Sequence, residues 1–304
     1  MNVFLTGANG YIGGSVAVRL MADGHRIRGL VRSPQAAGAV RAIAIEPVTG
    51  TLADTALLAR EAQRADAVVN AADSDDRAAV EAMLAALAGS GKPFIHTSGS
   101  SVVADDARGA ASVAVFDDSI HDAGSDWTPT ADKKARADLD RAILAGASQG
   151  VRAVVICPPL IYGHGLGPER DSRQLPTLVA QARASGIARH AGPGRNVWSN
   201  VHIEDLVDLY ALALAKAAPG TFLFAENGEA AFRDLTAAIA RALRLGPAQD
   251  WPIDEAVAAW GRGRTLYAQA SNSRIRATHA RALGWTPRHG SILAWIERNV
   301  APSP

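Results

Sequence analysis

Short apolar runs alternate with segments of helical periodicity along the first half of the chain. Because these runs are apolar at consecutive positions, they predict strands that are buried on both faces of a sheet. The expected strands cover residues 2–6, 25–31, 42–48, 67–72, 93–97 and 152–157, and the expected helices cover 15–21, 57–63, 77–87 and 130–147. Strands that alternate with helices predict an α/β protein with a doubly wound parallel sheet.

A glycine motif joins the first expected strand to the first expected helix. Gly7, Gly10 and Gly13 are spaced three residues apart. A strand, a glycine turn and a helix place bare backbone amides at a helix N-terminus, where the helix dipole also favours a pyrophosphate. An ordinary glycine-rich turn is the alternative, but the strand before and the helix after favour a dinucleotide site. Its expected contacts lie in the turn itself, namely Gly7, Asn9, Gly10, Tyr11, Ile12 and Gly13.

The second half of the chain is less regular. Helices are expected near 175–184, 201–214 and 232–243, a strand at 221–225, and an α-rich region beyond. We therefore predict a dinucleotide-binding Rossmann domain over 1–165, to which 196–225 returns, and a smaller α-rich C-terminal substrate lobe made of 166–195 and 226–304. The acidic, glycine-containing stretch 105–126 is expected to be a mobile loop.

The end of the second expected strand indicates which nucleotide is bound. NAD-binding folds usually place an acidic residue about 20 positions after the glycines, where it bonds the ribose 2′-hydroxyl. No Asp or Glu occurs between Gly24 and Ile45, and Arg32 and Ser33 stand at the strand end. A guanidinium matches a 2′-phosphate, although a solvated arginine is common at such a place. The sequence therefore favours NADP as the cofactor.

Other strand ends supply further candidate contacts. Ligands of doubly wound sheets lie at the carboxyl ends of the strands, so small and hydroxyl side chains there are expected near the nucleotide. The residues in these places are Ala71, Ala72, Thr97, Pro158 and Leu160. The two prolines at 158–159 are expected to stop strand pairing.

Composition limits the classes of function. The chain has 304 residues, is 48% hydrophobic and carries a net charge of +1, so no strong field recruits nucleic acid or an anionic membrane. No apolar run reaches the ~18 residues of a membrane span, and no signal peptide is recognisable, so a cytoplasmic location is expected. The single Cys157 excludes an internal disulfide and a multi-cysteine metal site, and no metal is expected. The expected partner is a small-molecule substrate, and a homodimer stays open.

The chain resembles the extended short-chain dehydrogenase/reductase superfamily of NAD(P)-dependent epimerases, dehydratases and reductases over almost its whole length. The resemblance rests on five motifs in order: Thr6-Gly7-Ala8-Asn9-Gly10-Tyr11-Ile12-Gly13, Thr97-Ser98-Gly99-Ser100, Pro158-Pro159-Leu160-Ile161-Tyr162-Gly163, Val201-His202-Ile203-Glu204-Asp205-Leu206 and Gly284-Trp285-Thr286-Pro287. It implies a Rossmann fold and a bound nicotinamide nucleotide.

The catalytic residues implied by the resemblance are only partly present. The family has Tyr-x-x-x-Lys, and the register that keeps Lys134 puts Thr130 at the tyrosine position. We expect Thr130 to be there without serving as the proton donor, because its hydroxyl is a poor acid at neutral pH. Lys134 would bond the nicotinamide ribose. The family's serine or threonine position falls on Gly99, with Ser98 and Ser100 beside it.

Two functions follow from this mixture. The favoured one is an NADP-dependent oxidoreductase or epimerase/dehydratase that acts on a small carbonyl or hydroxyl compound with a non-standard proton donor. Tyr162, His164 and His202 are the candidate donors, although packing, solvation and helix capping are ordinary roles for them. The alternative is a non-catalytic NADP-binding sensor, because the usual proton relay is missing.

Gly10→Val is predicted to abolish nucleotide binding while the fold is retained, because the new side chain occupies the space of the pyrophosphate. Fluorescence titration of both proteins with NADPH measures this. Equal affinities would refute the assignment of the glycine turn.

Overall fold

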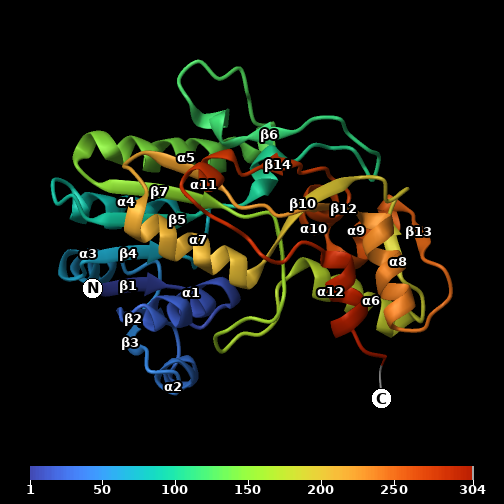
Figure 1. Ribbon diagram of the computed structural model, residues 1–304, viewed down its shortest axis with the longest axis horizontal. Helices are drawn as coiled ribbons and strands as arrows, with labels where there is room; N and C mark the ends of the chain where they lie inside the picture. Colours follow the sequence, from blue (N-terminus) through green and yellow to red (C-terminus); the bar gives the residue numbers. More distant parts are fainter. Residues whose placement is uncertain (303–304) are drawn as a thin grey trace.

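A seven-stranded parallel sheet forms the centre of the computed structural model, which describes residues 1–302 (Figure 1). The strand order is β11-β7-β5-β4-β1-β2-β3. The strands are β1 Asn2–Thr6, β2 Arg26–Val31, β3 Glu46–Thr49, β4 Ala67–Asn70, β5 Pro93–Thr97, β7 Arg152–Cys157 and β11 Thr221–Phe224. The prediction of a doubly wound parallel sheet is therefore confirmed.

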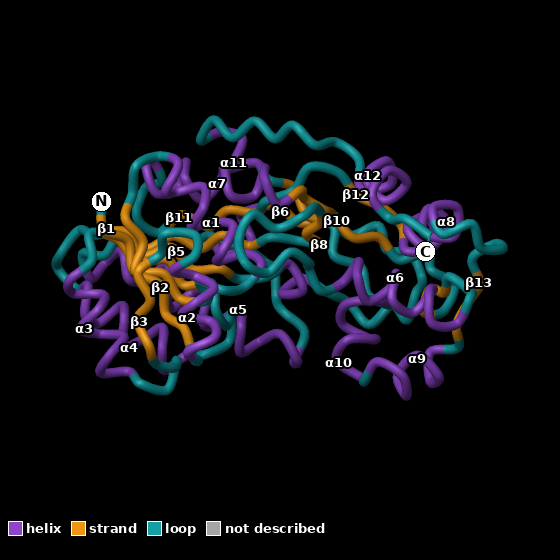
Figure 2. Tube along the Cα trace, turned by 90° about the horizontal axis from the view of Figure 1, so that it is seen from below, coloured by secondary structure: helices purple, strands orange, loops and turns teal. Residues whose placement is uncertain are grey.

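Helices cover both faces of this sheet. Helices α1 and α7 pack against each other on one face, and α3, α4 and α5 form a row on the other (Figure 2). The helices of this part are α1 Tyr11–Ala22, α2 Pro34–Arg41, α3 Thr55–Arg64, α4 Arg77–Leu87, α5 Lys134–Ala145, α7 Ile203–Lys216 and α11 Thr278–Ala282. Such coverage explains why the strands are apolar on both faces.

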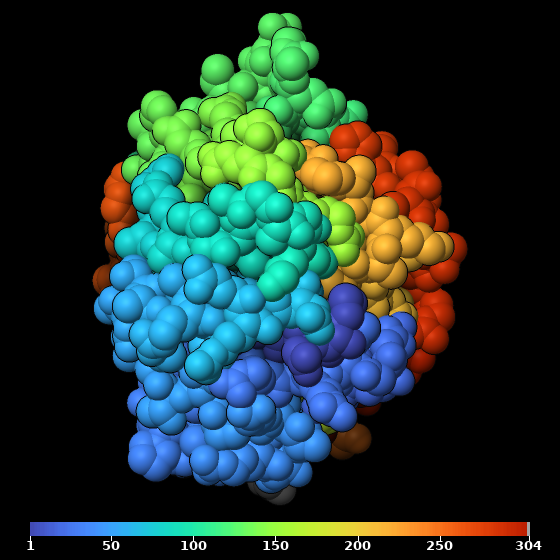
Figure 3. Space-filling model, turned by 90° about the vertical axis from the view of Figure 1, so that its left-hand side faces the viewer, coloured from blue at the N-terminus to red at the C-terminus, as the bar shows by residue number. Residues whose placement is uncertain are grey.

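The direction of strand addition reverses beside β1. The chain adds β2 and β3 on one side of β1, and then returns to add β4, β5, β7 and β11 on the other. Such a reversal leaves a crevice at the carboxyl ends of the two central strands, which is where doubly wound sheets bind ligands. The opposite, amino-terminal face holds the first residues of the chain near its centre (Figure 3).

A second body lies beyond the carboxyl ends of the strands (Figure 1). Its buried side chains form a separate cluster that includes Leu160, Trp198, Phe232 and Ile296. Its helices are α6 Gln174–Ser185, α8 Phe232–Ala242, α9 Ile253–Trp260, α10 Arg262–Arg264 and α12 Ile292–Asn299, and its strands are β8 Leu160–Tyr162, β9 Arg189–Ala191, β10 Val197–His202, β12 Glu229–Ala231 and β13 Gln249–Trp251. The lobe boundaries predicted above stay a prediction. Trp285, which falls within the predicted smaller lobe, packs in the core of the larger body.

The two prolines move the chain from one sheet to another. β7 ends at Cys157, directly before them, and β8 begins directly after them and pairs in parallel with β10. The expectation that pairing would stop holds only for the central sheet.

The segment 105–126 is not one free loop. Its second part contains β6 Phe116–Asp117, which pairs with β14 Ile275–Arg276. Asp118 is fully buried, and its carboxylate accepts hydrogen bonds from the amide of Phe224, from Thr278 Oγ1 at 2.7 Å and from the amide of His279 at 2.8 Å. The prediction of a loop is wrong for this part, because a buried carboxylate that joins distant segments leaves no pattern in the local sequence.

The third strand is shorter than expected. Residues 42–45 form a turn after α2, in which Ala44 has a positive φ of 64° and the amide of Ile45 donates to the carbonyl of Val40.

Among the described residues, no helix combines the length and the apolar character needed to cross a membrane.

Candidate functional site

The glycine turn lies in the crevice between β1 and β4. Gly7 has φ 71°, and a Cβ atom there would lie 2.7 Å from the carbonyl oxygen of Ala71. A Cβ at Gly13 would lie 2.3 Å from the carbonyl oxygen of Gly7. Both positions therefore exclude any side chain, the first because two loops touch and the second because the helix packs on the turn. Helix α1 begins after Gly10, and no side chain caps its N-terminus.

Thr6 joins the two loops of the crevice. Its hydroxyl donates to Asn70 Oδ1 at 2.5 Å and accepts from the amides of Ala71 at 3.1 Å and Ala72 at 3.2 Å. Two of the predicted contact residues are thus held beside the glycine turn. No local pattern signalled the role of Asn70, whose side-chain amide also bonds His96 Nδ1 at 3.0 Å.

The segment that follows β8 closes on the start of α1. Tyr11 donates its hydroxyl to the carbonyl of Gly163 at 2.9 Å, and the amide of Leu166 donates to Ser15 Oγ at 2.9 Å. Burial, together with the charge of Asp171, raises the pKa of Tyr11. This phenol is therefore a packing group, while Asn9 is exposed at the turn and Ile12 lies half-buried behind it.

The end of β2 presents the groups predicted to select NADP. Arg32 is exposed, and no ion pair within residues 1–302 involves it. Ser33 caps α2, because its Oγ accepts from the amide of Ala36 at 3.2 Å. The hydroxyl proton of Ser33 stays available for a further acceptor.

The hydroxyl groups after β5 are turned toward the protein. Ser98 donates to Asp140 Oδ2 at 2.8 Å, and Ser100 Oγ lies 2.7 Å from Ser273 Oγ. The hydroxyl of Thr97 lies 2.6 Å from that of Tyr210. All three side chains are buried. Their contacts with a nucleotide or substrate stay predictions, and each hydroxyl would have to exchange its present partner for the ligand. Pro158 and Leu160 are buried next to this turn, and the carbonyl of Pro158 accepts from the amide of Ser100 at 3.0 Å.

The start of α5 presents Arg136 to this turn. No sequence motif singled out Arg136. Its Nη1 donates to Ser101 Oγ at 2.7 Å, and a Cβ at Gly99 would lie 3.3 Å from the same nitrogen. Its Nε donates to Asp75 Oδ1 at 2.8 Å. Burial opposes the charge of this guanidinium, but the bond and charge of Asp75 outweigh it and raise the pKa of Arg136. The apolar Leu139 and Ile143, three and seven residues later, were the available signal, because they mark the inner face of the helix.

The predicted pair at the start of α5 faces solvent. Thr130 is exposed, and Lys134 is 68% exposed with its Nζ 2.5 Å from Asp138 Oδ2. As the predicted ribose anchor, Lys134 would have to leave Asp138 when nucleotide binds.

A sequence model of the NAD dependent epimerase/dehydratase family matches residues 3–223. The chain belongs to this family. An uncharacterized protein of Saccharomyces cerevisiae is 29% identical, with 99% of each chain covered. The oxidase ucsJ of Acremonium sp is 31% identical over 94% of this chain and 92% of that protein. A 4-hydroxy-2-methyl-3-oxo-4-farnesyl-3,4-dihydroquinoline-1-oxide ketoreductase of Stigmatella aurantiaca is 27% identical over 75% of this chain and 69% of that protein.

Solved structures of epimerase/dehydratase enzymes share the fold. The dTDP-glucose 4,6-dehydratase of Bacillus anthracis, in complex with NAD, gives a TM-score of 0.74 at 17% identity and covers 98% of this chain and 97% of its own. The UDP-glucose 4-epimerase of Thermotoga maritima, with UDP-glucose, gives 0.75 at 17% identity over 99% and 97%. At this identity the likeness shows the fold alone.

The remaining candidate donors of this family member lie in the second body. Tyr162 is buried and donates its hydroxyl to the carbonyl of His289 at 3.0 Å, and burial followed by the charge of Asp205 raises its pKa. His164 is exposed, with its ring 5.3 Å from that of Trp295. Each stays a predicted donor, and Tyr162 would first have to release a carbonyl.

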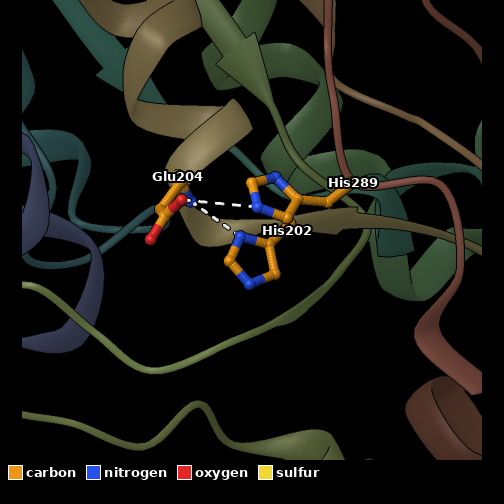
Figure 4. Close-up of side chains that lie close together, drawn as sticks. All are labelled: His202, Glu204 and His289. Carbon is orange, nitrogen blue, oxygen red and sulfur yellow. Dashed lines mark hydrogen bonds and ion pairs between the residues drawn. The ribbon is translucent and has the colours of Figure 1, made fainter. Parts of the chain in front are cut away.

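His202, Glu204 and His289 bring three ligand-type atoms within 4.8 Å of one another (Figure 4). The two imidazole rings are stacked, with centroids 3.8 Å apart and planes 17° from parallel. A nitrogen lone pair lies in the plane of its ring, so two nearly parallel rings cannot both aim at one ion. His289 instead lies between two carboxylates, with Nδ1 3.1 Å from Asp205 Oδ1 and Nε2 3.4 Å from Glu204 Oε2. The arrangement suits an ion pair better than a metal centre.

Lys134→Ala and Arg136→Ala are predicted to differ in their effects. The ion pair of Lys134 with Asp138 is exposed and screened by water, so its loss should leave the melting temperature unchanged. Loss of Arg136 should cost about 1–2 kcal/mol, because three hydrogen bonds of a largely buried guanidinium to Asp75 and Ser101 disappear. If Lys134 anchors the ribose, Lys134→Ala also weakens NADPH binding in calorimetric titration. Unchanged NADPH affinity would contradict that role.

His202 should make the protein less stable in acid. Burial, with help from the charge of His289, lowers the pKa of His202 to about 4. The unfolded chain takes up this proton near its ordinary pKa of about 6.5, so the unfolded state binds more protons between these values and stability falls as pH drops from about 6.5 to about 4, by up to about 3 kcal/mol. Urea unfolding across this range should show a flatter pH dependence for His202→Asn, whereas His25→Asn should keep the wild-type slope. A wild-type slope in His202→Asn would contradict the assignment.

Proposed function

We propose that the protein is an NADP-dependent oxidoreductase or epimerase/dehydratase that acts on a small carbonyl or hydroxyl compound. The observation that carries this proposal is the glycine turn at the reversal of strand order. There, two positions admit no Cβ atom and the N-terminus of α1 carries no side-chain cap. This turn offers bare backbone and unpaired amides to a diphosphate, and an ordinary tight turn needs neither feature.

The residues around the turn fit a nicotinamide nucleotide. The amides at Tyr11, Ile12 and Gly13 would hold the diphosphate, and the loop at Ala71 and Ala72 would lie against the ribose. Arg32 and Ser33 would hold the 2′-phosphate, because one brings an unpaired cation and the other a free hydroxyl proton. When bound, this nucleotide supplies or accepts the hydride.

Carbonyl reduction is the reaction that we favour for this protein. The similarity to a ketoreductase of Stigmatella aurantiaca and to an oxidase of Acremonium sp supports a redox reaction on a small molecule. The second body beyond the carboxyl ends of the strands would supply the substrate contacts. A cytoplasmic location and a homodimer stay predictions.

A nucleotide sensor without turnover is the second candidate. It is favoured by the arrangement around Gly99, where a hydroxyl side chain is missing and the guanidinium of Arg136 is engaged by Asp75. Steady oxidation of NADPH in the presence of carbonyl compounds would exclude it, and tight NADPH binding without turnover would favour it.

Arg32→Asp is predicted to reverse the nucleotide preference. The wild-type protein should bind NADPH roughly tenfold or more tightly than NADH, because a charge-assisted hydrogen bond contributes about 1.5–3 kcal/mol. The carboxylate repels the 2′-phosphate and accepts a hydrogen bond from the ribose hydroxyl. Calorimetric titration with both nucleotides measures the ratio.

Arg60→Asp is the matched control for this experiment, because Arg60 is also exposed but lies on α3. It makes the same change of charge and should keep the wild-type preference. A wild-type protein that prefers NADH, or a reversal by both variants, would contradict the role of Arg32.

A further inference from the structure

Three of the four tyrosine hydroxyls are committed to packing. Tyr11 donates to the carbonyl of Gly163, Tyr162 donates to the carbonyl of His289, and the hydroxyl of Tyr210 meets that of Thr97 in the core. Burial raises the pKa of each of these phenols. None of these three hydroxyls is hydrogen-bonded to a charged side chain.

The fourth phenol, Tyr267, lies among charged groups. It belongs to a short π-helical turn, Thr265–Gln269, whose two end residues are fully buried and hold it in place. Its hydroxyl donates to Asp132 Oδ2, and the Nζ of Lys133 lies 4.8 Å from the centre of its ring. A phenol that is half-buried, bonded to a carboxylate and covered by a cation is suited to proton exchange.

The turn that bonds Tyr267 contacts the turn Ser100–Val103, which follows β5. Asp132 and Lys133 belong to the short turn Ala131–Lys133 at the start of α5, and Arg136 follows Asp132 by one helical turn. Arg136 bonds Asp75, in the loop after β4, and Ser101, in the turn after β5. The carboxyl ends of β4 and β5 are therefore linked through α5 to the C-terminal segment that carries Tyr267.

We propose that Tyr267 is the proton donor of the protein's reaction, supplied by the C-terminal segment to the carboxyl ends of β4 and β5. This inference rests on the proposed oxidoreductase function. Asp132 is a positioning residue that holds the phenol, and Lys133 stabilises the phenolate that donation leaves.

Protonation of the substrate oxygen accompanies the transfer of a hydride from the nucleotide to the carbonyl carbon. The electron pair of the carbonyl π bond moves to the substrate oxygen. The O–H bond of Tyr267 breaks and an O–H bond forms on that oxygen. The phenolate then takes a proton from water, so each turnover consumes one hydride and one proton from solvent and yields the alcohol.

The charges around Tyr267 set the pH at which it acts. The hydrogen bond to Asp132 raises the pKa of Tyr267, and the nearby guanidinium of Arg262 opposes this shift. Burial and the charge of Arg136 lower the pKa of Lys133. The phenol is therefore protonated at neutral pH, and reduction should fail only in alkali.

Binding of NADP⁺ tests the location without relying on turnover. The protein is labelled with ¹³C at the phenol carbon of tyrosine, and the signals are assigned with Tyr267→Phe, Tyr11→Phe and Tyr162→Phe. NADP⁺ should shift the signals of Tyr11, beside the glycine turn, and of Tyr267, while that of Tyr162 stays. A shift of Tyr11 without Tyr267 would overturn the inference and leave the proposed function standing. No binding of NADP⁺ at all would overturn both.

Turnover identifies the donor. In NADPH oxidation with a carbonyl substrate, Tyr267→Phe should lower kcat by at least about 10²-fold while NADPH affinity is kept. Tyr162→Phe should do far less, and the reverse order would overturn the assignment. Asp132→Asn should move the alkaline limb of the kcat profile to lower pH, because the pKa of the phenol falls once the carboxylate is gone. An unmoved limb would show that Asp132 does not act on the donor.

Discussion

The close approach of two loops at the centre of the sheet is the constraint on which the proposed site depends. The turn after β1 lies so near the loop after β4 that a Cβ at Gly7 would meet the carbonyl oxygen of Ala71 at 2.7 Å. Thr6 fixes the same contact through hydrogen bonds to Asn70, Ala71 and Ala72. Because Gly13 lets α1 pack directly on this turn, the start of the helix is aimed into the crevice. The contact thus shapes the proposed nucleotide site and joins the ends of the paired strands β1 and β4.

A second constraint brings the smaller body over that site. The prolines after β7 end one strand and start another in a different sheet, so β8 and β10 carry the chain away from the carboxyl ends of the central strands. The chain returns through β14, which pairs with β6, and the carboxylate of Asp118 accepts from the amides of Phe224 and His279. The turn that carries Tyr267 lies on this path. Groups from both bodies can therefore share one site.

The sequence predicted the parts of the fold that have local causes. Buried parallel strands are apolar at every position, and the glycine turn has a fixed spacing, so the sheet and the crevice were both foreseen. The predicted start of the third strand was wrong because the backbone turns at Ala44, which has a positive φ. The predicted loop over 105–126 was wrong because Asp118 bonds residues that are distant in the sequence. The site was harder to predict for the same reason. A motif register cannot tell that Lys134 faces Asp138 and solvent while Arg136 faces Gly99, since both depend on the rotation of α5. The contact of Tyr267 with Asp132 joins residues far apart in the sequence, and no local pattern announces it.

The most direct test of the central claim is a crystal structure of the protein with NADP⁺. The account predicts that the diphosphate lies on the amides at the start of α1, between Gly7 and Gly13, and that the 2′-phosphate lies within hydrogen-bonding distance of Arg32 and Ser33. A nucleotide bound elsewhere, or one whose adenosine end leaves Arg32 in solvent, would contradict it.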